Sequence, residues 1–262
     1  MLEQPLWELP PLAGRRVSFL TLAADQATQA LAADVAARLR QAIADRGRAV
    51  LHVSGGQSPV ALFEALREQA LAWHQVEVSL ADERCVPHEH PDSNARLVRT
   101  HLLKGQAAHA RLLPLLPPSF ALPGSSSAGA ESAGLAQTAG LSELAEQAGQ
   151  ALRAQGPADV LVLGMGADGH TASIFAGMPN LAQALDPHGQ QTCLAVEGLP
   201  AWAPHARITQ TLAHLLSARH IVLPVRGSDK LQTLRRACRA HDLPISHVLH
   251  QSLAPVAVWI SS

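Results

Sequence analysis

Residues 159–177 read DVLVLGMGADGHTASIFAG, and this stretch decides the fold. An apolar run ends at Gly164, which together with two further glycines surrounds the carboxylate of Asp168 and the imidazole of His170. The pattern is typical of a buried strand, a glycine-rich turn and a helix. In α/β proteins the chemistry lies at such points, because glycines let a ligand approach the backbone and a helix start offers unpaired N–H groups. We expect a binding site here, followed directly by a helix.

The composition narrows the class of protein. The chain has 262 residues, of which 47% are apolar, so it is long enough for a sizeable core. Its 20 basic and 21 acidic residues balance, which argues against nucleic acid or an anionic membrane as the main partner. Three widely spaced cysteines indicate a reducing compartment. With neither a signal peptide nor a membrane-spanning run in the sequence, we expect a cytoplasmic protein.

Strand-like apolar runs alternate with helical patterns along the chain. The predicted strands are 16–22, 49–53, 76–81, 159–163, 221–225 and 256–260, and the predicted helices are 25–45, 59–66, 94–103, 141–153, 207–216 and 228–239. Such alternation favours a parallel sheet with helices on both faces, whose strands end at one edge.

We predict a single domain over residues 1–262. Residues 117–140 are rich in Pro, Gly, Ser and Ala, which predicts a long, mobile surface loop. Because this segment lacks residues suited to touching a substrate, an insertion is a better interpretation than a lid.

A second glycine turn, SGGQSP at residues 54–59, lies between a predicted strand and a predicted helix. Its Gly55 and Gly56 allow close approach, and the Ser58 hydroxyl with exposed N–H groups can hold a phosphate. The sequence has neither a P-loop nor a Gly-x-Gly-x-x-Gly fingerprint, so a dinucleotide is not indicated. Taken alone, the turn also fits a simple helix cap.

Charged residues follow other predicted strands. Asp82 and Arg84 come directly after the predicted strand 76–81, where they can hold a hydroxylated, anionic ligand or stabilise developing negative charge. Arg207 begins a predicted helix, and Lys230 follows the strand at 221–225. Two such cations with the Gly-Gly turn would give a phosphate pocket, although singly each fits a surface cation.

The sequence indicates no metal and no cofactor. His88 and His90 form an H-x-H pattern, but two ligands without a third make a poor metal site, and an exposed loop is the better interpretation. Cys85, beside an arginine, has no partner that would make it a nucleophile, so we expect a passive thiol.

His170 is the candidate general base, because histidine titrates near neutrality and can take a proton from water and return it. Asp168 either orients this imidazole or acts on the substrate itself. No G-x-S-x-G elbow is present, which favours direct attack by water over a covalent intermediate.

Together these motifs resemble those of the 6-phosphogluconolactonases, in the glucosamine-6-phosphate isomerase/6-phosphogluconolactonase family. The segment GMGADGHTASIFAG resembles the family signature, SGGQSP its phosphate loop, and ADERCVP followed by DSN its D-E-R segment. Later, RITQTL and GSDK resemble its Arg and Lys segments. The resemblance runs in order over roughly residues 16–260.

The resemblance implies a modified Rossmann-type fold, as in glucosamine-6-phosphate deaminases and ribose-5-phosphate isomerases. It implies hydrolysis of 6-phospho-D-glucono-1,5-lactone to 6-phosphogluconate in the pentose phosphate pathway, without a cofactor. By this likeness His170 is the general base, and Arg84, Arg207 and Lys230 contact the substrate. Gln57 stands among the phosphate-loop residues where the family often has a small serine.

Two alternatives remain open. One is a sugar-phosphate deaminase or isomerase of the same fold, although deaminases tend to continue the D-G-H turn through an F-N-E-P-G-like run, whereas TASIF follows here. The other is a non-catalytic sugar-phosphate sensor, which would need a DNA-binding or partner domain that the sequence does not indicate. The sequence leaves the oligomeric state open, and a monomer is compatible with it.

Overall fold

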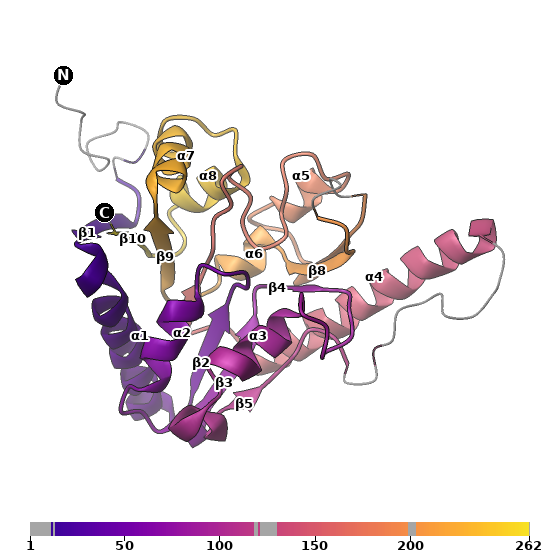
Figure 1. Ribbon diagram of the computed structural model, residues 1–262. Coiled ribbons are helices and arrows are strands. Elements are labelled where there is room, and N and C mark those ends of the chain that lie inside the picture. The colour runs from indigo at the N-terminus through magenta and orange to yellow at the C-terminus, as the bar shows by residue number, and fades with distance from the viewer. Residues whose placement is uncertain (1–11, 13, 118–119, 121–129, 199–202, 262) are drawn as a thin grey trace.

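A seven-stranded sheet lies between layers of helices (Figure 1). The computed structural model describes residues 12, 14–117, 120, 130–198 and 203–261, with only the backbone described for 130–139. In spatial order the strands are β1 (Val17–Leu22), β10 (Val256–Ser261), β9 (Ile221–Arg226), β6 (Val160–Val162), β2 (Ala49–Val53), β3 (Val76–Leu80) and β5 (Arg111–Leu112), and every neighbouring pair is parallel.

The strand order reverses between β2 and β6. From β2 the chain proceeds to β3 and β5 on one side, and from β6 it proceeds to β9 and β10 on the other. Ligands bind at such a switch point in open α/β sheets, outside the carboxyl ends of the strands. The fold therefore places the candidate site where β2 and β6 end.

Side chains of the central strands alternate between two hydrophobic cores. Leu51 and Val53 of β2 join the core that includes residues of the helices α1 (Ala24–Arg46), α2 (Val60–Arg67) and α3 (Asn94–His101). Val50 joins the core that includes residues of α5 (Leu181–Ala184), α6 (Leu212–Leu215), α7 (Ser228–Arg239) and α8 (Pro244–Leu249). Each such buried Val or Leu contributes about 1.5–3 kcal/mol. The predicted parallel sheet with helices on both faces is confirmed.

A second, antiparallel sheet flanks the first. Its strands are β4 (Asp82–Arg84), β8 (Arg207–Gln210) and β7 (Cys193–Val196), with β8 in the middle. The prediction of one helix over 207–216 is therefore wrong: the segment is β8 followed by the short α6, which Thr211 caps by accepting from the His214 N–H. Pairing with β4 on one side and β7 on the other stabilises residues 207–210 as a strand by more than their local helix propensity would stabilise a helix.

The expected helix directly after His170 is also absent. Thr171 instead forms isolated bridges with Met165 and Ile174, and its hydroxyl donates to the Gly164 carbonyl at 2.8 Å. Among the described residues, the first helix after this turn is α5. The segment after His170 folds back on the end of β6 through these contacts, and it does not continue as a helix.

The predicted loop at 117–140 needs a similar correction. Helix α4 (Ala130–Gln155) already includes residues 130–140, where Ala, Glu and Leu favour a helix. Residues 118–119 and 121–129 lie outside the described residues. Apart from α4, α6, β8 and the helix expected after His170, the predicted elements end within two residues of the observed ones. The elements that were not predicted are β4, β5, β7, α5, α8 and two 3₁₀ turns (Trp73–Gln75 and Gly105–His109). No helix in the described ranges is long and apolar enough to span a membrane.

Candidate active site

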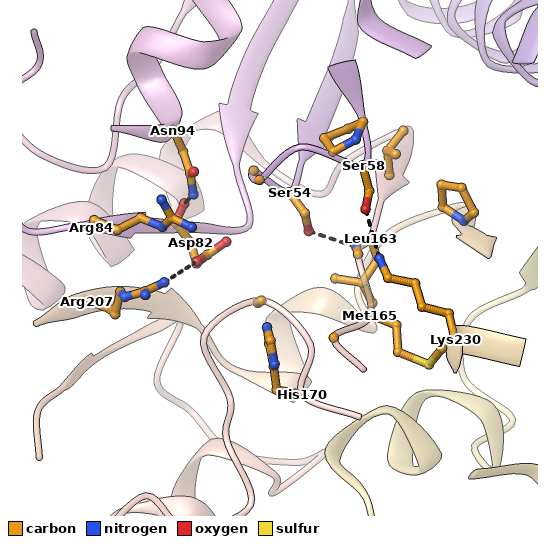
Figure 2. Close-up of a pocket in the computed structure, with 18 residues that line it drawn as sticks. Ser54, Ser58, Asp82, Arg84, Asn94, Leu163, Met165, His170, Arg207 and Lys230 are labelled. Carbon is orange, nitrogen blue, oxygen red and sulfur yellow. Dashed lines mark hydrogen bonds and ion pairs between the residues drawn. The ribbon is translucent and has the colours of Figure 1, made fainter. Parts of the chain in front are cut away.

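A pocket lies at the switch point and gathers most of the predicted site residues (Figure 2). Those that line it are Gly55, Gly56, Ser58, Asp82, Arg84, His170, Arg207 and Lys230. Two others do not line it: Asp168 is hydrogen-bonded to His170, which does line it, and Gln57 is exposed. Segments far apart in the sequence thus meet at one edge of the sheet.

The ends of β2 and β6 are tied together under the pocket. The Ser54 N–H donates to the Val162 carbonyl at 2.9 Å, and the Gly164 N–H donates to Ser54 Oγ at 3.0 Å. A Cβ on Gly55 would lie 1.8 Å from Asn94 Oδ1, so only glycine fits there. The backbone of the glycine turn therefore packs directly against Asn94 of α3 and also lines the pocket.

A buried carboxylate fixes α3 beside β4. Glu83 accepts hydrogen bonds from the N–H groups of Asn94 at 2.8 Å and Ala95 at 2.7 Å. Burial raises the pKa of this carboxyl, and the hydrogen bonds of its charged form oppose that shift. Asn94 in turn donates from Nδ2 to the Asp82 carbonyl at 2.9 Å. The side chains on either side of Glu83 in β4 are held firmly at the pocket.

His170 and Asp168 form a hydrogen-bonded pair. His170 Nδ1 lies 2.5 Å from Asp168 Oδ1, and the hydrogen bond with the imidazole lowers the pKa of the Asp168 carboxyl. The Phe175 ring packs on the imidazole with ring centroids 4.5 Å apart. Figure 2 shows the His170 ring pointing into the pocket. An ionised Asp168 that accepts from Nδ1–H makes Nε2 the basic nitrogen of the ring.

Residues of helices α7 and α8 support the turn that carries this pair. Thr233 of α7 donates its hydroxyl to the Ala167 carbonyl at 2.6 Å, and the Ile245 N–H of α8 donates to the Gly169 carbonyl at 3.0 Å. Gly169 has φ +83° and packs on Leu243. The position of His170 therefore depends on the packing of α7 and α8.

Two arginines form one end of the pocket. The β4–β8 pairing sets Arg84 directly opposite Arg207. Arg207 is only 8% exposed, and its Nη1 lies 3.9 Å from Asp82 Oδ2 and 3.4 Å from Ser173 Oγ. Burial, and then the charge of Arg84, lower the pKa of Arg207. The nearby carboxylates of Asp82, Glu83 and Asp92 oppose that shift. Arg84 and Arg207 both line the pocket, and guanidinium groups in this position can bind an anion.

Lys230 forms another cationic group, with the glycine turn. Its Nζ donates to Ser58 Oγ at 2.8 Å, which joins the first turn of α7 to the segment before α2. Burial lowers the pKa of Lys230. Figure 2 shows Lys230 and Ser58 on one side and Arg84 and Arg207 on the other, with His170 between them. The structure thus brings Arg207 next to Arg84, whereas the sequence suggested a grouping with Lys230.

Sequence reasoning missed several residues of the site. Ser54, Asn94, Ser173 and Phe175 all lie in the quoted motifs, but their roles depend on long-range contacts. Ser173, for example, donates to Asp82 Oδ2 at 2.6 Å from a position 91 residues away. Their position within the motifs is the sequence signal that could have identified these residues as part of the site.

The fold and pocket define a class of α/β proteins with an Asp–His pair and cationic side chains at the sheet's switch point. The chain belongs to the family of glucosamine-6-phosphate isomerases and 6-phosphogluconolactonases, which its residues 23–259 match.

Individual relatives agree with this assignment. A 6-phosphogluconolactonase of Pseudomonas aeruginosa is 48% identical over 224 residues, 84% of each chain. The crystal structure of a 6-phosphogluconolactonase from Shewanella baltica is 36% identical, with a TM-score of 0.75 over 94% of this chain and 98% of that one. A monomeric glucosamine-6-phosphate deaminase, 17% identical, shares the fold with a TM-score of 0.66 over 94% of this chain and 96% of its own. The expected deaminase-like fold is confirmed.

Proposed function

We propose that this protein hydrolyses 6-phospho-D-glucono-1,5-lactone to 6-phospho-D-gluconate. The observation that carries the proposal is the Asp168–His170 pair, which faces a pocket with cationic groups on both sides (Figure 2). The product has a phosphate at one end and a carboxylate at the other, which matches this charge distribution. The names of the relatives support the same substrate.

The substrate binds between the two cationic groups. Backbone N–H groups of Gly55 and Gly56, the Ser58 hydroxyl and the Lys230 ammonium hold the phosphate. Arg84 and Arg207 face the lactone carbonyl. Binding of the remote phosphate positions the reacting carbon near His170, which lowers the entropic cost of the attack.

The reaction needs one base and one charge stabiliser. His170 Nε2 takes a proton from water as the water oxygen bonds to C1, and the carbonyl electron pair moves to the exocyclic oxygen. Arg84, Arg207 or N–H groups of the 164–169 turn stabilise that oxyanion. When it collapses, the bond from C1 to the ring oxygen breaks, and His170 returns the proton to the ring oxygen. No cofactor takes part.

A covalent route through the nearby thiol has no support. Cys85 is buried, and burial raises its pKa to about 12, so it is protonated at neutral pH. The thiolate is the nucleophilic form of cysteine. This agrees with the passive role expected from the sequence and leaves water as the attacking group.

The deciding experiment measures hydrolysis of freshly generated 6-phosphogluconolactone, with spontaneous opening subtracted. A rate above the spontaneous one supports the proposal. Release of ammonia from glucosamine 6-phosphate would assign the chain to the deaminases instead. Binding of 6-phosphogluconate with no hydrolysis would favour a sensor. We also propose a cytoplasmic location, on the compositional grounds given above.

Replacing Lys230 with methionine tests the phosphate end. KM for the phosphorylated lactone is expected to rise about 10- to 100-fold, since a hydrogen bond to a charged group contributes about 1.5–3 kcal/mol. KM for unphosphorylated D-glucono-1,5-lactone should hardly change. Lys104→Met, at an exposed lysine away from the pocket, is the matched control. Equal changes with both substrates would remove Lys230 from the phosphate site.

Gly166→Ala tests the placement of the catalytic pair. A Cβ at this position would lie 2.2 Å from His170 Nδ1 and 2.5 Å from Asp168 Oδ1, so the pair must move. A displacement of about 1 Å is expected to lower kcat about 100-fold. Gly177→Ala is the control, because a Cβ there meets nothing within 4 Å. Steady-state kinetics of both variants check the prediction, and an unchanged kcat in Gly166→Ala would contradict it.

A further inference from the structure

Three potential metal ligands lie close together beside the pocket: His90, Asp92 and His205. The first two belong to the loop after β4, and His205 precedes β8. The sequence offered only His88 and His90. In the structure His88 lies elsewhere, with its Nε2 3.2 Å from the Leu116 carbonyl. The β4–β8 pairing brings His205 to Asp92 from 113 residues away, which supplies the ligands that the sequence pattern lacked.

The spacing of these atoms suits one small cation. His205 Nε2 lies 2.9 Å from Asp92 Oδ2, His90 Nδ1 lies 3.9 Å from the same oxygen, and the three ligand atoms lie within 4.8 Å of one another. A tetrahedral zinc ion with bonds of about 2.0–2.1 Å holds its ligand atoms about 3.4 Å apart. The distances of 2.9 Å and 3.9 Å lie on either side of that value, so small side-chain rotations would bring the ligand atoms into place.

The donor set selects the kind of metal. Two imidazoles and one carboxylate favour a transition-metal ion such as Zn²⁺ over Mg²⁺ or Ca²⁺, which prefer oxygen ligands. The side chains are 36%, 51% and 26% exposed for His90, Asp92 and His205, so water can reach a fourth coordination position. We propose that His90, Asp92 and His205 form a site for a divalent transition-metal ion, with Zn²⁺ as the best fit.

An ion at this site would connect the two strands that carry the pocket arginines. It would link the loop after β4 to the segment entering β8. Arg84 Nη1 already donates to the Asp92 carbonyl at 2.6 Å, so one ligand residue is in direct contact with the pocket lining. The metal would therefore act as a clip at the arginine end of the pocket, whether or not the proposed reaction is correct.

The test uses the purified full chain after treatment with a chelator. Titration calorimetry with zinc chloride is expected to show one ion bound, and Co²⁺ is expected to give the visible bands of tetrahedral coordination. His90→Gln and His205→Gln should each weaken binding by more than about tenfold. His74→Gln, at an exposed histidine outside the cluster, is the matched control and should bind as the parent does.

Other outcomes would overturn the proposal. Unchanged binding in both His90→Gln and His205→Gln would place the metal elsewhere, as would binding that is lost in His170→Gln and retained in these two variants. Absence of any stoichiometric binding by the folded parent protein would remove the site altogether. Because neither readout uses catalysis, failure here leaves the proposed lactonase activity untouched, and failure of that activity leaves the metal site testable.

Discussion

The His170→Ala variant is expected to lose about 10²–10⁴-fold in kcat, which is the usual contribution of a general base. The imidazole points into the pocket and its Nδ1 lies against Asp168, so we assign the activation of water to Nε2 (Figure 2). Alanine removes that base and leaves both cationic groups in place. KM should therefore change much less than kcat. Initial rates on fresh lactone, corrected for spontaneous opening, measure the effect.

Two further variants make this result specific. His188→Ala removes an exposed histidine outside the pocket and should keep the parent's kcat. Asp168→Asn keeps the base but replaces the ionised carboxylate that orients it, and should lower kcat by less than His170→Ala does. A His170→Ala variant with the parent's kcat would remove His170 from the reaction. A larger loss in Asp168→Asn would instead make Asp168 the residue that acts on the substrate.

Residues whose roles depend on local geometry could be predicted from the sequence. Gly55, Gly56 and His170 each follow a short apolar strand, and the parallel sheet places such strand ends at one edge. The pattern of apolar residues determines the strands, and the glycines mark where the chain must turn tightly. These signals depend on a few neighbouring residues, so the sequence contains them directly.

Residues whose roles depend on long-range pairing could not be predicted in the same way. Residues 207–210 have a local pattern that also fits a helix, and only pairing with β4 and β7 makes them a strand. That pairing puts Arg207 opposite Arg84, and it puts His205 beside Asp92. The prediction of a helix directly after His170 was also wrong because of a tertiary contact. The Thr171 hydroxyl donates to the Gly164 carbonyl, and this contact folds the segment back on the strand end.

Arg207→Met is the variant with the next largest expected effect, a loss of about 10²–10³-fold in kcat/KM. That is the usual cost of removing one donor to a developing oxyanion. Arg207 is nearly buried, and its guanidinium lies 5.9 Å from the centre of the Phe175 ring, which also packs on His170. Arg207 and His170 thus both lie against the Phe175 ring, which supports the proposal that the arginine faces the lactone.

A comparison of phosphorylated and unphosphorylated lactones distinguishes a lactone-facing Arg207 from the phosphate-binding Arg207 that the sequence suggested. If Arg207 faces the lactone, Arg207→Met should lower kcat/KM similarly for phosphorylated and unphosphorylated lactones. If it binds phosphate with Lys230, only the phosphorylated substrate should suffer, through KM. Arg207→Lys keeps the charge without the planar fork and should recover part of the activity. Thermal unfolding of each variant shows whether lost activity reflects lost folding, because removing Arg207 leaves the buried Asp82 carboxylate with Ser173 but without its arginine partner.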